Sequence, residues 1–137
     1  MFYDALKCAW HWVKTRKPIF IENSRVPVLL SYVSPININA ISFGPFVWSR
    51  STMDERVRRH EWVHFQQQLE CFFALQWLLY GSFYLFNLIK YRGNGALAYY
   101  NIAFEREAYS HDEQEDYMAT RPFYNWIGYI KNETKRL

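Results

Sequence analysis

The stretch that decides the fold comprises residues 53–71 and reads MDERVRRHEWVHFQQQLEC. It contains no proline or glycine, and most of its residues are good helix formers. Ser51 and Thr52, just before it, are both candidate N-caps, and Thr52 with Glu55 three residues later fits the capping box that begins many helices. The sequence therefore predicts a helix that begins near Thr52 and extends to about Cys71.

Further helical segments follow on the C-terminal side of this stretch. Residues 71–91 are mostly apolar and predict a second helix, which a turn at residues 92–95 (Arg-Gly-Asn-Gly) ends. Residues 96–119 predict a third helix, which Pro122 stops, and residues 123–134 predict a short last one. The C-terminal two thirds of the chain should therefore be helical.

The N-terminal part has a different pattern. Residues 2–15 predict a short amphipathic helix, and residues 18–34 contain two short runs that resemble β-strands. Residues 40–48 alternate and are rich in β formers, with a Gly-Pro pair that indicates an edge strand, a bulge or a bend. A small β region followed by a helical core predicts the α+β class.

Composition narrows the possible functions. The chain has 137 residues, of which 50% are hydrophobic and 20% aromatic, so it predicts one folded domain over residues 1–137. A net charge of +3 without a block of like charge argues against a nucleic-acid partner. Cys8 and Cys71 form no CxxC pair, so a thiolate zinc site is not supported, and we expect two buried thiols, with a disulfide as the alternative.

Residues 71–89 approach the length of a helix that spans a bilayer. Polar residues interrupt the run, and its aromatic residues are spread along it instead of gathering at its ends. We therefore predict a buried core helix or helix pair, with a segment in or on a membrane as the alternative. Residues 1–17 lack the features of a signal peptide, which predicts a cytoplasmic protein.

The residues most specific to a chemistry are His60-Glu61-Trp62-Val63-His64, an HExxH motif. Residues four apart on a helix lie on one face, so the two histidines can bind one metal ion together. Glu61 lies at the edge of that face, where it can take a proton from water on the metal. Two histidines and a carboxylate also suit ferrous iron, but the glutamate after the first histidine favours zinc and hydrolysis.

A catalytic zinc site needs a third protein ligand and an open position. The residues after His64 are Phe-Gln-Gln-Gln, so the HExxHxxGxxH continuation of metzincins is absent from the sequence. The segment at residues 101–109, NIAFEREAY, is the obvious donor of the third ligand. The downstream candidates are Glu70, Glu105, Glu107, His111, Asp112 and Glu113.

An HExxH motif followed by a helical Glu-x-x-Ala element resembles the gluzincin peptidases. The order of ISFGPFVW, HEWVHFQQQ and AYYNIAFEREAY also resembles small zinc-peptidase-like proteins of bacteria and phages, over roughly residues 40–112. The resemblance implies a minimal zincin-like domain, a zinc cofactor (Zn2+) and hydrolysis of peptide bonds. It also implies Glu105 as the third ligand, or Glu107 if the thermolysin-like pattern applies.

Other residues can serve such a reaction. Tyr109 and His111 are candidates for polarising a substrate carbonyl, although His111 also fits a surface histidine. Gln67 lies one turn past the motif and can support the site, and a peptide or protein substrate would pair with an edge strand at residues 41–48. The alternative function is a non-catalytic zinc-binding module whose aromatic residues contact a larger assembly.

Overall fold

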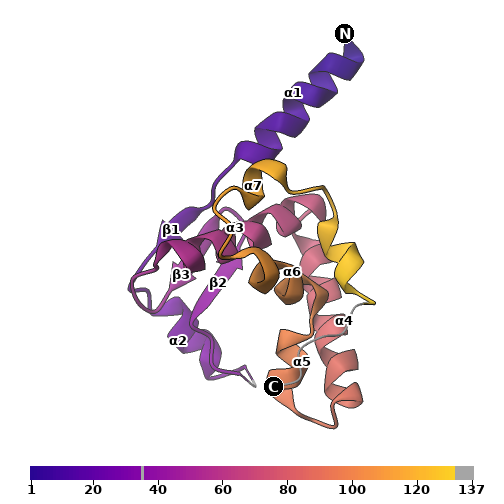
Figure 1. Ribbon diagram of the computed structural model, residues 1–137. Coiled ribbons are helices and arrows are strands. Elements are labelled where there is room, and N and C mark those ends of the chain that lie inside the picture. The colour runs from indigo at the N-terminus through magenta and orange to yellow at the C-terminus, as the bar shows by residue number, and fades with distance from the viewer. Residues whose placement is uncertain (35, 132–137) are drawn as a thin grey trace.

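The computed structural model describes residues 1–34 and 36–131 (Figure 1). Its elements are α1 (Phe2–Thr15), β1 (Ile19–Ile21), α2 (Val26–Ser31), β2 (Ala40–Phe43), β3 (Phe46–Ser49), α3 (Glu55–Glu70), α4 (Ala74–Lys90), α5 (Gly95–Tyr100), α6 (Ala103–His111), α7 (Tyr117–Thr120) and the 3₁₀ helix η1 (Asn125–Tyr129). The α+β class predicted from the sequence is confirmed. The helix α1 projects away from the body that the other elements form (Figure 1).

The sheet has the strand order β1-β3-β2, with β3 parallel to β1 and antiparallel to β2. The expected strand at residues 40–48 is therefore a hairpin, and the Gly-Pro pair forms its bend. Gly44 has a φ of 58°, a conformation that glycine adopts without the clash of a Cβ atom. Because β3 is central, the edge strand of this hairpin is β2 alone.

The second β-like run predicted within residues 18–34 is wrong, because that segment is the helix α2. Pro27 lies in the first turn of α2, where the N–H that proline lacks has no partner in the helix. The carbonyl of Pro27 accepts a hydrogen bond from the Ser31 hydroxyl at 2.8 Å. Helical hydrogen bonding thus prevails over the β propensity of the valine residues in this segment.

The helix predicted over residues 53–71 is present as α3, but its cap differs from the expected one. Asp54 is the N-cap, and its Oδ1 accepts a hydrogen bond from the backbone N–H of Val57 at 2.8 Å. The capping box expected from Thr52 is therefore wrong by two residues. Aspartate caps a helix as well as threonine does, and its charge also favours the positive end of the helix dipole.

The long helix predicted over residues 96–119 is instead three shorter ones, α5, α6 and α7. Asn101 ends α5, and its side-chain amide donates to the carbonyl of Leu97 at 2.8 Å. Ile102 then has a ψ of 132°, so the chain is extended for one residue before α6 begins. The predicted last helix is only η1 within the described residues, and residues 132–134 lie outside them.

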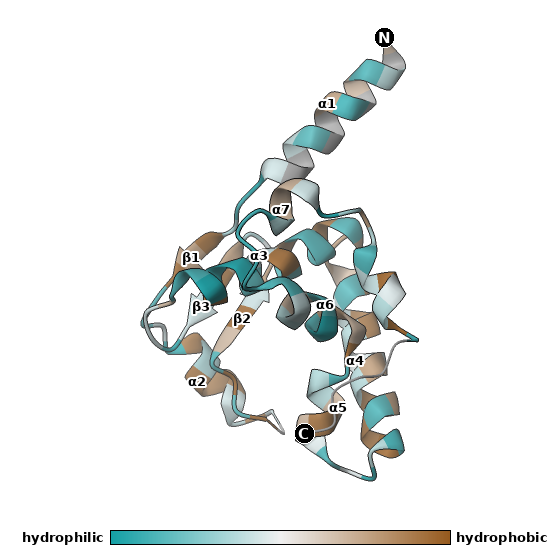
Figure 2. Ribbon diagram, viewed as in Figure 1, coloured by the Kyte–Doolittle hydropathy of each residue, from teal (hydrophilic) through white to brown (hydrophobic). Residues whose placement is uncertain are grey.

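Most side chains of α3 are buried although the helix is largely hydrophilic (Figure 2). It packs against α6, α4 and β2. Apolar clusters flank it: Ile102, Phe104 and Trp126 pack together on one side, and Val63 and Ala108 lie in another cluster. A buried helix with this many polar groups requires specific partners for them, which is typical of a functional site.

Both cysteines are free. Cys71 is buried in the core, as expected, whereas Cys8 is exposed on α1, so that part of the prediction is wrong. The position of Cys8 follows from the way α1 projects from the body of the protein (Figure 1).

Candidate metal centre

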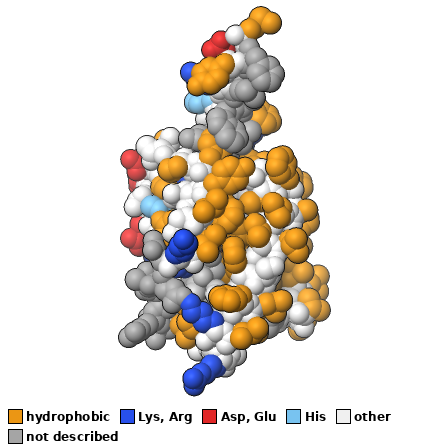
Figure 3. Space-filling view, turned by 90° about the vertical axis from the view of Figure 1, so that its right-hand side faces the viewer, with side chains coloured by type: hydrophobic (Ala, Val, Ile, Leu, Met, Phe, Trp, Pro, Cys, Tyr) orange, Lys and Arg blue, Asp and Glu red, His pale blue; other side chains and the backbone are white. Residues whose placement is uncertain are grey.

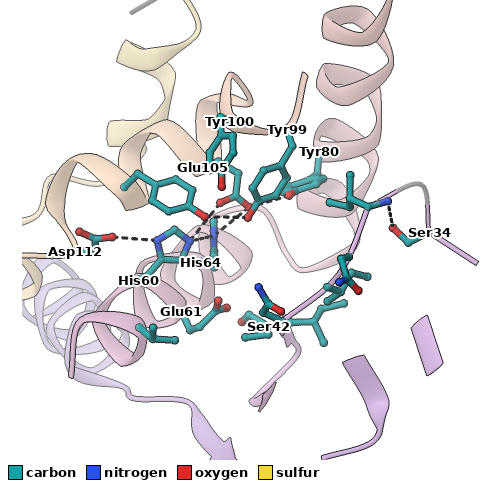
Figure 4. A pocket seen from close by; sticks show the side chains of 18 of the residues that line it. Ser34, Ser42, His60, Glu61, His64, Tyr80, Tyr99, Tyr100, Glu105 and Asp112 are labelled. Atoms are coloured by element: carbon teal, nitrogen blue, oxygen red, sulfur yellow. Dashed lines mark hydrogen bonds and ion pairs between the residues drawn. The ribbon is translucent and has the colours of Figure 1, made fainter. Parts of the chain in front are cut away.

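Three buried side chains from two helices converge at one point. His60 and His64 come from successive turns of α3, and Glu105 comes from the first turn of α6. The Nε2 atoms of the two histidines are 3.1 Å apart. Oε2 of Glu105 is 3.3 Å from Nε2 of His60, and its Oε1 is 3.3 Å from Nε2 of His64 (Figure 4).

These separations fit a zinc ion. Ligand atoms about 2.1 Å from a tetrahedral zinc are about 3.4 Å from one another, close to the 3.1–3.3 Å found between the three side chains. Oε2 of Glu105 is buried and has no hydrogen-bond partner among the described residues, as expected of an atom placed to bind a cation. Within residues 1–34 and 36–131, these three residues are the one group found with the spacing of metal ligands.

Glu107, the alternative third ligand, lies on another face of α6. Its carboxylate accepts hydrogen bonds from the side chains of Arg121, Tyr117 and Gln67. Arg121 also donates to both carboxylate oxygens of Glu70, so a buried cation is shared by two buried carboxylates. Glu107 therefore has a full set of partners away from the histidines, whereas Glu105 faces them.

Each of the three converging residues is oriented by one further side chain. Nδ1 of His60 lies 3.6 Å from Oδ2 of Asp112, and Nδ1 of His64 lies 2.8 Å from Oε1 of Gln67. The hydroxyl of Tyr80 donates to Oε1 of Glu105 at 2.7 Å. Such partners fix the ring orientation of a ligand histidine and leave its other nitrogen free for the metal.

The sequence predicted only part of this supporting set. A role for Gln67 follows from helical spacing, because it is one turn beyond the motif. Asp112 was expected only as a possible ligand, and Tyr80 gave no signal because it lies within the apolar run at residues 71–89. Their roles depend on tertiary contacts between helices that are distant in sequence, which helical periodicity does not report.

The electrostatics of the cluster favour a positive charge. Burial lowers the pKa of His60, but the nearby carboxylates of Asp112 and Glu105 outweigh it and raise the pKa to about 10. Burial raises the pKa of Glu105, yet the charge of His64 and the adjacent ring of His60 hold it well below the usual range. The carboxylates thus attract a cation to the point between the two rings.

Glu61 lies beside this cluster without belonging to it. Figure 4 shows its side chain on the side of the cavity that faces Ser42, opposite Tyr99 and Tyr100. Burial raises the pKa of Glu61, and the charges of the neighbouring histidines oppose this only in part. The carboxylate is therefore a better proton acceptor than an exposed glutamate would be.

The centre opens into a cavity of about 970 Å³. The cavity is lined by backbone and side chains of β2, by α3, and by aromatic residues of α4 and α5. Tyr109 lines it, with its ring centroid 4.3 Å from that of His60. A site of this size on one side of the three converging residues leaves room for water and for a substrate.

His111 lies outside this cavity. Its Nε2 pairs with the hydroxyl of Tyr129 at 2.8 Å, its Nδ1 pairs with Gln114 at 2.9 Å, and its ring stacks on Tyr117. The structure thus gives His111 local partners and no place beside the metal centre. The role predicted for it in polarising a substrate carbonyl has no support, and Tyr109 is the remaining candidate.

Comparison of the chain with protein-family models, with curated proteins and with solved structures gave no match. The function must therefore be inferred from the geometry and chemistry of the site itself.

Proposed function

We propose that the protein is a zinc-dependent peptidase. The observation that carries this proposal is the convergence of His60, His64 and Glu105 beside Glu61 at the wall of a large cavity. Zinc held by these ligands would supply a polarised carbonyl and a water molecule of lowered pKa. A non-catalytic zinc-binding module would use the ligands but neither Glu61 nor the cavity.

Three protein ligands support a catalytic site over a structural one. Structural zinc sites have four protein ligands and no open position, whereas catalytic sites keep one position for water or substrate. In the described part of the chain, the ligand group has three members and borders the cavity. A fourth protein ligand, as the non-catalytic module would require, is not found there.

The residues of the chain would divide the reaction between them. Glu61 would take a proton from the attacking water and deliver it to the leaving amine. Tyr109, whose ring lies against His60 on the cavity wall, would donate a hydrogen bond to the carbonyl oxygen. Asp112 and Gln67 would hold the two histidine rings in place.

The edge strand β2 offers a means of binding an extended peptide. Its residues lie along the cavity, and β3 occupies only one of its two edges. Hydrogen-bonded and non-hydrogen-bonded pairs alternate in an antiparallel ladder, and Arg50 donates to the Asn39 carbonyl across it. The backbone groups of Ala40 therefore point away from β3, where they can pair with a substrate main chain.

The test compares Glu61→Gln with Glu55→Gln. Glu55 is exposed at the start of the same helix and does not line the cavity, so its substitution controls for a change of charge on α3. We expect the wild type and Glu55→Gln to cleave members of an unselective peptide library. Glu61→Gln should keep its zinc and its melting temperature but lose about 10²–10⁴-fold in cleavage rate.

Two results would contradict the proposal. If Glu61→Gln loses its metal or unfolds, Glu61 has a ligand or core role instead. If the wild type binds zinc but cleaves nothing, and X-ray absorption at the zinc edge shows four protein ligands, the site is structural.

A further inference from the structure

The helix α4 is apolar on its outward face as well as on the face that packs against the core. Its inward face packs apolar side chains against the core and also carries Gln76, Tyr80 and Asn87, of which Gln76 and Asn87 are buried and Tyr80 reaches the metal centre. Its outward face carries large apolar side chains. Leu78 is 68% exposed, and Ile89 is 81% exposed. A helix at the surface of a globular protein normally presents polar side chains outward.

These outward residues lie along one side of α4, and we call this area the α4 surface. It comprises Leu75, Leu78, Leu85, Phe86, Ile89 and Ile130. The first five recur at helical spacing along one stripe of α4, and Ile130 joins them because it lines a small hollow together with Phe86. Figure 3 shows hydrophobic side chains gathered over this side of the body.

Within the described residues, no single helix is long and apolar enough to cross a bilayer. The pair α3 and α4 meets the length and composition criteria together, but the two helices are bent by 112° at the break between them. The side chains of α3 that contribute to this pair include those of the metal centre, which are buried by α6. The exposed apolar stripe of α4 alone therefore suits contact with a surface, with the helix axis lying in its plane.

The charges around the α4 surface indicate what kind of surface it contacts. Residues 71–104 contain no aspartate or glutamate, whereas Lys90 and Arg92 follow the stripe and Lys131 lies beyond Ile130. All three cations are exposed. On the body of the molecule, Figure 3 shows acidic side chains only at the margin of this face. An apolar stripe bordered by cations complements an anionic lipid surface.

We infer that the protein binds anionic membranes through the α4 surface. A second copy of the chain fits less well, because an isologous contact pairs the surface with itself and offers no acidic group to Lys90 or Arg92. The inference does not depend on catalysis, since α4 contributes to binding through its outward face and to the cavity through its inward face.

The test is co-sedimentation of the full chain with vesicles, either of phosphatidylcholine alone or of an equimolar mixture with phosphatidylglycerol. We expect strong binding to the anionic mixture, weakened by salt, and weak binding to phosphatidylcholine alone. Leu78→Glu should lower the partition coefficient at least tenfold, because it removes apolar contact and adds a repelled charge. Lys90→Gln should lower it about fivefold, the effect of one cation near such a surface.

The matched control is Leu29→Glu. Leu29 is 63% exposed on α2, on the opposite side of the body from α4, so this variant adds the same charge to an equally exposed leucine (Figure 1). It should bind anionic vesicles as the wild type does, and the zinc content and circular dichroism of each variant report whether it is folded. The inference is wrong if the wild type does not bind anionic vesicles, or if both leucine variants lose binding equally. It is also wrong if the wild type is a dimer that Leu78→Glu dissociates while vesicle binding is unchanged.

Discussion

Replacing Glu105 and Glu107 separately by glutamine should impair two different properties, zinc binding and folding stability. Both residues are buried on α6, two positions apart, so the same substitution is made in closely matched surroundings. Oε2 of Glu105 is 3.3 Å from His60 and lacks a hydrogen-bond partner among the described residues. Glu107 instead pairs with Arg121. The first substitution should therefore affect zinc, and the second should affect folding.

The expected magnitudes follow from these contacts. Four-ligand zinc sites bind with roughly 10–16 kcal/mol, or about 2.5–4 kcal/mol per ligand, so Glu105→Gln should weaken zinc binding on the order of 10²–10³-fold. Glu107→Gln leaves the ligands in place and acts on them only through Gln67, so it should weaken zinc binding by no more than about 10–100-fold. It breaks a buried ion pair, which should lower the free energy of unfolding by about 3–5 kcal/mol and the melting temperature by about 10–17 °C.

The measurements are zinc affinity by competition with a chelator and thermal unfolding of the zinc-free protein. Glu105→Gln should destabilise the zinc-free protein less than Glu107→Gln does, because His60 and His64 can release their protons once the carboxylate is lost, whereas Arg121 stays charged. If Glu107→Gln loses more zinc affinity than Glu105→Gln, or if both lose the same, the assignment of Glu105 as the third ligand is refuted.

Two further predictions test the surroundings of the site. Gln67→Ala should weaken zinc binding about 10–100-fold, because the ring of His64 loses its partner. Gln66 is an equally buried neighbour whose side chain donates to the Arg16 carbonyl, so Gln66→Ala should leave zinc binding unchanged. Chelator competition on both variants measures the two affinities, and equal losses would contradict the role of Gln67. A thiol reagent should modify only Cys8 in the native protein, because Cys71 is 2% exposed and burial raises its pKa to about 11; rapid reaction of two thiols before unfolding would show that Cys71 is accessible.

The sequence was most informative where a single helix carried the signal. The i, i+4 spacing of His60 and His64 depends only on helix geometry, so their common face could be predicted without knowledge of the tertiary structure. The choice between Glu105 and Glu107 could not, because each lies on a plausible helix face. What distinguishes them is Arg121, which comes from a later segment of the chain and forms an ion pair with Glu107.

The errors in the predicted fold have a common cause. The second β-like run within residues 18–34 and the cap at Thr52 are predictions from local propensities, which several conformations satisfy almost equally. A proline in the first turn decides the first case, and the better-placed carboxylate of Asp54 decides the second. Likewise, His111 matches a catalytic residue by type, but its place beside Tyr129 follows only from the packing of η1 on α6.

The two faces of α4 connect the two proposals physically. Tyr80 on the inward face donates to Glu105, and Leu78 lies on the outward face two residues earlier. A helix with its side chains is about 10 Å across, so a membrane bound to the outward face would lie about one helix diameter from the cavity wall. Because the outward face contributes nothing to the metal centre, loss of membrane binding in Leu78→Glu should leave zinc affinity unchanged. A change in zinc affinity in that variant would instead show that the two faces of α4 are energetically coupled.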